Sequence, residues 1–310
     1  MPRRLDPNDI QRLASAGMLR LDRLLSNLGH CSRGSCRQWL RQNRVCINGK
    51  HALAPKAHVD PSTVTVNDKS LVEFSHGIGP LSIILNKPPG FVCSRADEGK
   101  EHPLIYSLLP KHFYWRRPLL VPAGRLDKYA TGLVVLSQEG PLIHRLTAPK
   151  GKRNKMEKVY DIVARRPFRG DEPLLFSSGE LSLRGEAGNP CLPAQLEFLD
   201  DSLSRARLTL REGRYHQIRR MLAVVNNQAV SIHRRRVGPI ELDEAEIPSG
   251  HWRPLTSTEY DAIMTYEPEE VDEVVEAETI LSAEQVGKDL VELSRKGRPD
   301  VNLTEFFPQK

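Results

Sequence analysis

Apolar residues near the N-terminus of this chain repeat at helical spacing and are followed by short alternating segments. Four leucines lie three or four residues apart, as on one face of an amphipathic helix, and Gly29 follows as a stop signal. They are Leu21, Leu24, Leu25 and Leu28. A second helix is predicted after Ser32, Asn48-Gly49 is typical of a hairpin turn, and residues 63–66 alternate as a strand. A final strand and then a linker are predicted within residues 70–80.

Further along, the apolar pattern is dominated by strands. Predicted strands, either alternating or continuously apolar, cover residues 81–86, 132–136, 157–163, 195–199, 206–210 and 230–232. A helix is expected after Pro141, and another from about 217, which would pack Ile218, Met221, Leu222 and Val225 inward. Strands and helices do not alternate as in a parallel sheet. We therefore predict an α+β fold, with a mixed, largely antiparallel sheet and flanking helices, preceded by a small α/β domain.

These patterns divide the chain into five parts. We expect a flexible extension, a small N-terminal domain, a linker, a large domain, and an acidic, disordered tail. The predicted boundaries are 1–18, 19–76, 77–80, 81–265 and 266–310. An alternative for the tail is that it folds back on a basic surface and competes with a substrate.

Charge is distributed unevenly along the chain. The 310 residues contain 45 Lys and Arg and 39 Asp and Glu, a net charge of +6. Residues 267–310 carry 12 acidic and 5 basic residues, so residues 1–266 carry 27 acidic and 40 basic ones. A body with a balance of +13 points to a polyanionic partner, most simply nucleic acid.

Several classes of protein are not supported by the sequence. The five cysteines form no C-x-x-C pair, which favours reduced thiols in a cytoplasmic setting, and neither they nor the histidines show metal-ligand spacing. Phosphate-binding glycine patterns are missing, so no nucleotide cofactor is expected. No apolar run has membrane-spanning length. We expect a protein without metal, cofactor or membrane partner; an organellar location stays open for a eukaryotic source.

The candidate chemistry centres on residues 123–140, AGRLDKYATGLVVLSQEG. Asp127 lies in a loop that enters a buried strand, a position that holds a catalytic side chain rigidly. The structural alternative is that Asp127 only caps a turn or pairs with Arg125, and the residue spacing taken alone favours this alternative. Arg234, Arg235 and Arg236 form a basic cluster that is most simply surface or nucleic-acid contact.

The N-terminal domain resembles the alpha-L type of RNA-binding domain found in a small-subunit ribosomal protein. The resemblance rests on RLDRLL, CSR and INGK in that order. It implies that arginines on the second helix contact RNA. These are Arg33, Arg37, Arg41 and Arg44.

Three stretches of the large domain resemble pseudouridine synthases of the small-subunit (RsuA) type. They are GRLDKYATGLVVLSQEG, MEKVYDIV and EGRYHQIRRML, behind LNKPPGFVCS. The resemblance implies that Asp127 is the catalytic aspartate, that Tyr160 stacks on the target base, and that Arg219 pairs with the catalytic carboxylate. It also implies that Arg125 helps to hold the flipped nucleotide. Arg220 is expected to contact RNA, and two residues are left as either RNA contacts or scaffold: Arg214 and His216.

The resemblance also implies a partner and a reaction. We expect a monomeric protein that isomerises uridine to pseudouridine in small-subunit ribosomal RNA or a pre-ribosomal particle. One alternative is a large-subunit or other RNA target. An alternative of another class is a non-catalytic RNA-binding factor in ribosome assembly, although such a factor would be free to lose Asp127.

Overall fold

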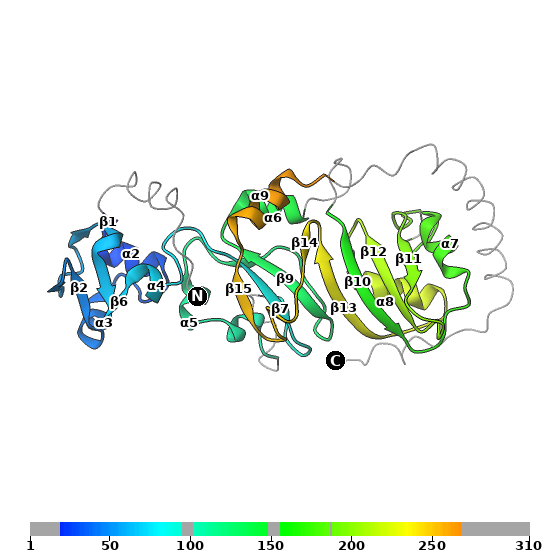
Figure 1. Cartoon of the computed structure of the whole chain (residues 1–310), viewed down its shortest axis with the longest axis horizontal. Helices are drawn as coiled ribbons and strands as arrows, with labels where there is room; N and C mark the ends of the chain where they lie inside the picture. The colour runs from blue at the N-terminus through cyan, green and yellow to red at the C-terminus, as the bar shows by residue number, and fades with distance from the viewer. Residues whose placement is uncertain (1–18, 95–101, 148–155, 187, 268–310) are drawn as a thin grey trace. The chain divides into compact units, whose positions relative to one another are not determined.

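The structure, a computed structural model, describes residues 19–94, 102–147, 156–186 and 188–267 (Figure 1). The chain divides into two compact units. Among the described residues, the first unit combines those from Leu19 to Met156 with His233–Tyr266, and the second consists of those within Glu157–Ile232 together with Glu267. The predicted extension over 1–18 and nearly all of the predicted tail over 266–310 lie outside the described residues.

The N-terminal part of the first unit is a small helical and antiparallel β structure. Its helices are α2 (Leu21–Asn27), α3 (Cys36–Gln42), α4 (Leu71–Phe74) and the 3-10 helix η1 (Pro61–Thr63). Its strands are β1 (Leu19–Arg20), β2 (Val45–Ile47), β3 (Lys50–His51), β4 (His58–Val59), β5 (Val64–Val66) and β6 (Lys69–Ser70). β1 pairs with β4, and the others form a sheet in the order β3-β2-β5-β6. All four leucines of the predicted first helix are buried, which confirms that helical face.

Two predictions for this part have different outcomes. The Asn48-Gly49 hairpin turn is confirmed, since it joins β2 and β3 with positive φ angles of 49° and 73°. The predicted strand at the start of residues 70–80 is wrong beyond Ser70. The Ser70 hydroxyl accepts a hydrogen bond from the Glu73 amide at 3.1 Å and so caps α4.

The segment after α4 is held by a buried arginine, Arg116, which follows α5 (Lys111–Trp115). Its guanidinium donates to the side-chain oxygen of Gln138 at 3.0 Å and to three main-chain carbonyls. These belong to Ser75, Gly77 and Gly79, at 3.1, 3.2 and 2.7 Å. Burial lowers the pKa of Arg116 to about 10. The segment predicted as a linker is therefore fixed to the protein by its own carbonyl groups.

The rest of the first unit is a sheet with helices on one face. Its strands run in the order β13-β9-β7-β15, with β14 on β13 and β8 on β9. They are β7 (Ser82–Lys87), β8 (Val121–Pro122), β9 (Thr131–Ser137), β13 (Ala229–Val237), β14 (Ile240–Glu241) and β15 (Trp252–Pro254). The first four residues of β13, up to Ile232, belong to the second unit. Helices α6 (Gly140–Thr147) and α9 (Ser257–Thr265) lie side by side on this sheet (Figure 1). Leu142, Leu146 and Ile263 join strand residues in one buried cluster, which is the core under the site described below. A 3-10 helix, η2 (Ile105–Leu108), precedes α5.

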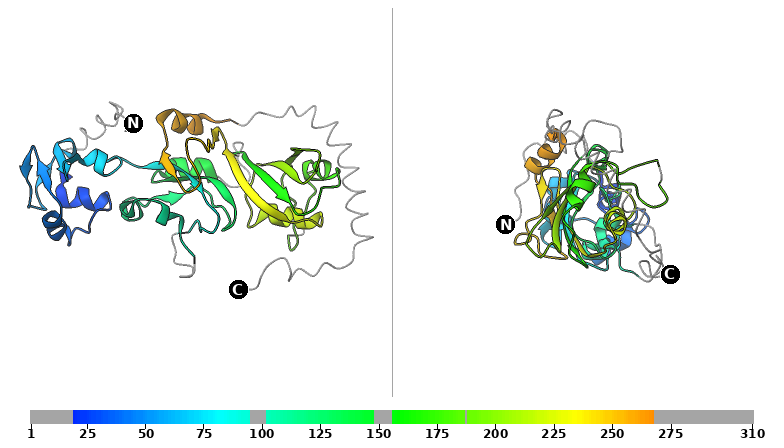
Figure 2. Two further views of the ribbon diagram at one scale, coloured as in Figure 1. Left: turned by 60° about the horizontal axis from the view of Figure 1, so that its bottom comes forward. Right: turned by 90° about the vertical axis from the view of Figure 1, so that its right-hand side faces the viewer.

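The second unit has three antiparallel strands in the order β11-β12-β10. They are β10 (Lys158–Ala164), β11 (Gln195–Phe198) and β12 (Arg205–Leu210). Helix α7 (Glu172–Ser177) packs beside β11 (Figure 2). Helix α8 (Gln217–Val224) buries Ile218, Met221 and Leu222, as predicted. β9 pairs with β13 in parallel, and the other pairings described here are antiparallel. The predicted α+β class with a mixed, largely antiparallel sheet is confirmed.

Candidate functional site

Asp127 lies where the sequence places it, in the loop that leads into β9. The Ala130 amide donates to the Asp127 carbonyl at 3.1 Å, so residues 127–130 form a β-turn. Gly132, two residues further on, has a φ of 101°. A Cβ there would stand 2.4 Å from the Arg234 carbonyl oxygen. Only glycine allows β13 to approach this closely, and the approach fixes the strand that follows Asp127.

A buried lysine supports the turn from inside the protein. Lys87 ends β7 and has no exposed surface. Its ammonium group donates to three main-chain carbonyls, those of Pro88, Lys128 and Ala130, at 3.0, 2.9 and 2.6 Å. Burial lowers the pKa of Lys87 to about 8, while electrostatic interactions with Cys93 and Asp127 raise that pKa by a smaller amount. The position of Asp127 is thus tied to a cation that has carbonyls, not a carboxylate, as hydrogen-bond partners.

Arg234 is a second buried cation in the same place. It is only 2% exposed. Its Nε donates to the Leu133 carbonyl at 2.7 Å, and its Nη1 donates to the Arg125 carbonyl at 3.4 Å. The prediction that Arg234 belongs to a surface cluster is therefore wrong. Strand alternation explains the error, because Arg234 shares the inward face of β13 with Ile232.

The predicted partners of Asp127 in the second unit lie on β10 and α8. Tyr160 is a buried residue of β10 and lies opposite Leu208 of β12. Arg219 is in the first turn of α8, and its Nη1 donates to the Ala229 carbonyl at 3.5 Å. The structure places Asp127 and Arg125 in one unit and Tyr160 and Arg219 in the other. The meeting of these four side chains at one substrate remains a prediction.

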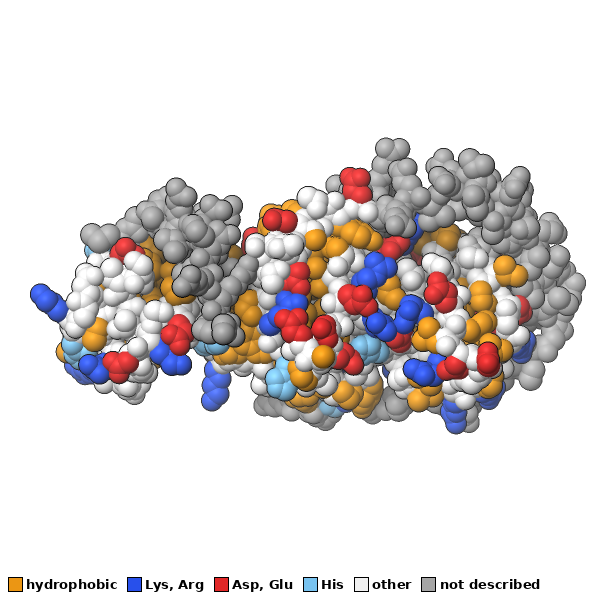
Figure 3. Space-filling model, viewed as in Figure 1, with side chains coloured by type: hydrophobic (Ala, Val, Ile, Leu, Met, Phe, Trp, Pro, Cys, Tyr) orange, Lys and Arg blue, Asp and Glu red, His pale blue; other side chains and the backbone are white. Residues whose placement is uncertain are grey.

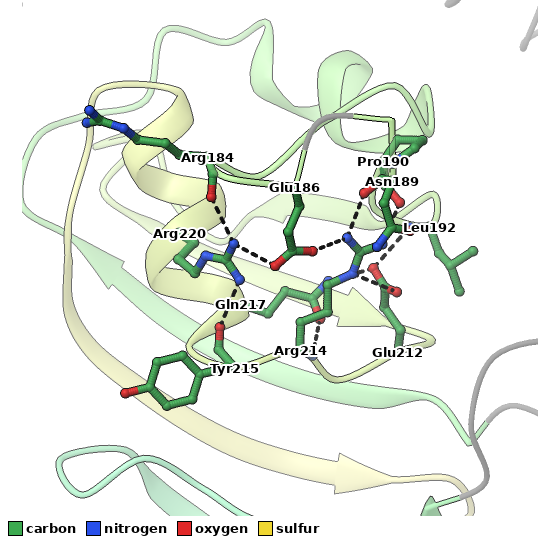
Figure 4. Close-up of polar contacts among 10 residues, drawn as sticks. All are labelled: Arg184, Glu186, Asn189, Pro190, Leu192, Glu212, Arg214, Tyr215, Gln217 and Arg220. Carbon is green, nitrogen blue, oxygen red and sulfur yellow. Dashed lines mark hydrogen bonds and ion pairs between the residues drawn. The ribbon is translucent and has the colours of Figure 1, made fainter.

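The loop before α8 is held by a network of two arginines and two glutamates (Figure 4). Arg214 pairs with Glu186 at 2.7 Å and with Glu212 at 3.2 Å. It also donates to the carbonyls of Asn189, at 2.7 Å, and Pro190. This use of the whole guanidinium favours the scaffold role for Arg214 that the sequence left open.

The same network reaches the helix itself. The Gln217 side chain accepts from the Arg214 amide at 2.8 Å and donates to Glu212 at 2.9 Å. Arg220 pairs with Glu186 at 2.6 Å and donates to the carbonyls of Arg184 and Tyr215 (Figure 4). The pKa of Glu186 is lowered, first by its hydrogen bond with Arg220 and then by that with Arg214. His216 opens α8 in the left-handed conformation, with a φ of 48°. Arg219 therefore stands on a helix whose first turn is fixed.

The arginines of the N-terminal domain are all on its surface. Arg33, Arg37, Arg41 and Arg44 are exposed. Arg44 forms an exposed ion pair with Asp68 at 3.0 Å. Exposed pairs of this kind are weak, so each of the four guanidinium groups can exchange solvent or a carboxylate for a phosphate.

Basic side chains do not form one uniform surface. On the face shown in Figure 3, acidic and basic side chains are interspersed over the first unit. Around β14 and β15, Arg235 pairs with Glu241 at 2.9 Å, and Arg253 pairs with Glu246 and Glu259 at 3.0 and 2.7 Å. Carboxylates therefore neutralise part of the positive charge locally.

The residues that sequence reasoning missed are the supports of the site: Lys87, Arg234, Glu186 and Glu212. Arg234 was open to prediction from the period-two alternation of β13. Lys87 carried a weaker signal, a lysine at the end of a buried strand just before Pro88-Pro89. Glu186 carried none, because it is 28 and 34 residues away from Arg214 and Arg220, the two arginines that it binds.

Comparison with known proteins connects this geometry to a family. Residues 82–224 match the family described as RNA pseudouridylate synthase, and residues 19–64 match the S4 domain. Ribosomal small subunit pseudouridine synthase A of Yersinia pestis is 36% identical over 241 residues, which are 78% of this chain and 96% of that protein. The protein of the same name from Escherichia coli K12 is 35% identical over 246 residues, 79% of this chain and 100% of that protein.

A solved structure gives the same result. A crystal structure of a pseudouridylate synthase is 34% identical and covers 79% of this chain and 99% of its own, with a TM-score of 0.52. In the part of the chain that the structure describes, the helices are too short or too polar to span a bilayer.

Proposed function

The chain belongs to the RNA pseudouridylate synthase family, and from this premise we propose that it converts a uridine of small-subunit ribosomal RNA to pseudouridine, with Asp127 as the catalytic carboxylate. The observation that carries the residue assignment is the turn of residues 127–130, which presents one carboxylate from a backbone fixed by Lys87. Relatives named for the small ribosomal subunit support the choice of RNA.

The reaction is an internal transfer that needs no redox step. The C1′–N1 bond breaks with its electron pair on N1, the detached uracil turns, and a C1′–C5 bond forms. The proton lost from C5 and the proton gained at N1 balance. A carboxylate assists by attacking the sugar, by removing a proton, or by stabilising positive charge on the ribose, as carboxylates do in glycosidases. Asp127 is the group proposed for this step.

The other predicted residues would bind and orient the substrate. Tyr160 would stack on the detached base, after that base has left its helix, and so retain it beside the sugar. Arg219 would pair with the Asp127 carboxylate, and Arg125, an exposed residue of the same loop, would hold the flipped nucleotide. The rigid first turn of α8 supports this role for Arg219, since a guanidinium pairs well only from a fixed position.

The N-terminal domain would supply RNA affinity. We propose that residues 19–76 bind RNA through the exposed arginines, that residues 81–265 carry catalysis, and that the protein acts as a monomer without cofactor. The cytoplasm, where bacterial ribosomes assemble, is the proposed location. His216 and Arg220 would contact RNA from the start of α8, beside the network of Arg214, Glu186 and Glu212.

Pseudouridine mapping of ribosomal RNA tests the proposal. Cells with the wild-type chain, without it, and with Asp127→Asn are compared, and Asp261→Asn, at an exposed position on α9, is the matched control. We expect one small-subunit site to disappear in the second and third strains and to persist in the control.

Other outcomes would decide between the alternatives. If the lost site lies only in large-subunit RNA, the proposed substrate is wrong and the proposed reaction stands. Unchanged sites together with impaired ribosome assembly would refute the enzyme and favour the assembly factor. A site that survives Asp127→Asn but not deletion would refute the role of Asp127.

A further inference from the structure

Two side chains stand at the tip of the turn that begins with Asp127. The hydrogen bond from the Ala130 amide to the Asp127 carbonyl makes Lys128 and Tyr129 the two central residues of this β-turn. In such a turn the first and last Cα atoms are within about 7 Å of each other. Tyr129 is therefore two residues from Asp127 in the same tight turn.

The backbone of this tip is rigid. The Lys128 carbonyl accepts from the Gly90 amide at 2.8 Å and from Lys87 Nζ at 2.9 Å. The Ala130 carbonyl accepts from the same ammonium group at 2.6 Å. The main chain on both sides of Tyr129 is thus bound from inside the protein, while the side chain is directed to the surface.

The aromatic ring of Tyr129 is largely exposed to solvent and so contributes little to the hydrophobic core. Its side chain is 63% accessible to solvent. The ammonium group of Lys128 lies 4.8 Å from the centroid of the tyrosine ring and 3.0 and 3.2 Å from the two ring nitrogens of the exposed His102. An aromatic ring beside a cation, on a rigid turn, is the combination that binds single-stranded nucleic acid. The ring stacks on a base, and the cation meets a phosphate.

We propose that Tyr129 is a stacking platform for an unpaired base next to the target uridine, and that Lys128 contacts the adjoining phosphate. The inference rests on the proposed function, because it takes Asp127 as the residue that meets the target. When one nucleotide leaves its stack, its neighbour loses a stacking partner. Tyr129 would replace that partner and would make recognition depend on the nucleotide beside the uridine.

The first test distinguishes aromatic stacking by Tyr129 from a contact that needs only an apolar side chain of similar size. The full-length protein acts on a synthetic RNA hairpin that contains the uridine found by mapping, and the variants are Tyr129→Phe, Tyr129→Leu and Tyr129→Ala. Loss of one base–aromatic stack lowers affinity by roughly 10-fold to 100-fold. We expect KM to rise by that factor for the leucine and alanine variants, while the phenylalanine variant stays within about twofold of wild type because it keeps the ring.

A matched control removes an exposed apolar side chain elsewhere. Leu174, on α7, is also exposed, and Leu174→Ala should leave KM unchanged. Equal KM values for wild type and Tyr129→Ala would overturn the inference. A rise in KM for alanine but not for leucine would also overturn it, since apolar bulk would then suffice.

The second test changes the RNA. Each nucleotide that flanks the uridine is replaced in turn by an abasic nucleotide, and binding is measured with Asp127→Asn so that catalysis does not interfere. At one position the abasic change should weaken binding to Tyr129→Phe, in that background, about 10-fold or more, and should have no effect on binding to Tyr129→Ala. Additive effects at every position would refute stacking.

The inference and the proposed function fail in different ways. If wild type forms no pseudouridine in any ribosomal RNA, the proposed function fails. If wild type forms pseudouridine and no Tyr129 variant changes KM or binding, only the inference that Tyr129 stacks on a base is refuted.

Discussion

At the Asp127 turn the buried supports are cations whose partners are main-chain carbonyls, whereas at the start of α8 the supports are carboxylates that bind arginines. Lys87 donates to three carbonyls and Arg234 to two. In the second unit, Arg214 and Arg220 share Glu186, and Glu212 completes the network. Both regions hold a proposed functional side chain in a fixed position, but they do so with opposite chemistry.

The difference teaches what each support contributes besides rigidity. A carbonyl is a dipole and does not cancel the charge of its ammonium or guanidinium partner, so this positive charge acts on the Asp127 carboxylate. Two glutamates against two arginines leave a network without net charge. We therefore expect substitutions at the first region to change both geometry and electrostatics, and substitutions at the second to change mainly geometry.

The largest effect should come from Gly132→Ala, which forces apart the strands behind Asp127. The new Cβ would meet the Arg234 carbonyl at 2.4 Å, and φ is 101°. Overpacking and backbone strain together should lower the free energy of unfolding by about 4 kcal/mol. Denaturant unfolding of the purified variant measures this loss.

Gly170→Ala is the matched control for Gly132→Ala. Gly170 has a nearly equal φ of 103°, and a Cβ there would have no neighbour within 4 Å. Its loss should be about 1–2 kcal/mol, from the positive φ alone. Equal losses at the two glycines would show that the contact with β13 does not hold the turn.

Lys87→Met should have the next largest effect. Three carbonyls lose their donor, which should reduce stability by about 3 kcal/mol even though a costly buried charge is removed. Pseudouridine formation should fall by about 100-fold, because the turn and its field change together. Lys50→Met, at an exposed position, is the control and should change neither quantity. Full activity in Lys87→Met would show that catalysis does not depend on the hydrogen bonds from Lys87 to this turn.

Arg214→Lys should reduce stability by about 2 kcal/mol, because lysine keeps the charge but cannot bind two glutamates and two carbonyls at once. Arg44→Lys is the control, since its pair with Asp68 is exposed and should contribute less than about 0.5 kcal/mol. A double-mutant cycle with Glu186→Gln checks that the loss arises in the network. Independent effects in that cycle would contradict the shared role given to Glu186.

The sequence predicted the elements that bear the site better than the contacts that hold it. Strands β9 and β10 and helix α8 follow from local periodicity, and Asp127 and Tyr160 occupy the expected elements. Arg234 was misassigned because three successive arginines obscured the alternation of β13. The pairing of Glu186 with Arg214 depends on how the chain returns to itself after 28 residues, and no local pattern specifies that.

The smallest predicted effect separates the two regions by pH. Burial sets the pKa of Lys87 at about 8, below its ordinary value of 10.5, whereas the pKa of Glu186 is lowered and that of Arg214 is raised. Between pH 7 and 9 only the first support changes its charge. Over that range the unfolded chain keeps the Lys87 proton and the folded chain releases it, so stability rises with pH.

The gain from Lys87 should be about 1 kcal/mol between pH 7 and 9 and should be missing in Lys87→Met. Amide chemical shifts locate the change. The amide shifts of Ala130, in the turn, and of Gly90, which donates to the Lys128 carbonyl, should titrate with a midpoint near 8, while that of Arg214 should stay constant. If the Arg214 amide moved with the same midpoint, the two supports would be coupled, and their opposite chemistry would serve one shared structure rather than two independent ones.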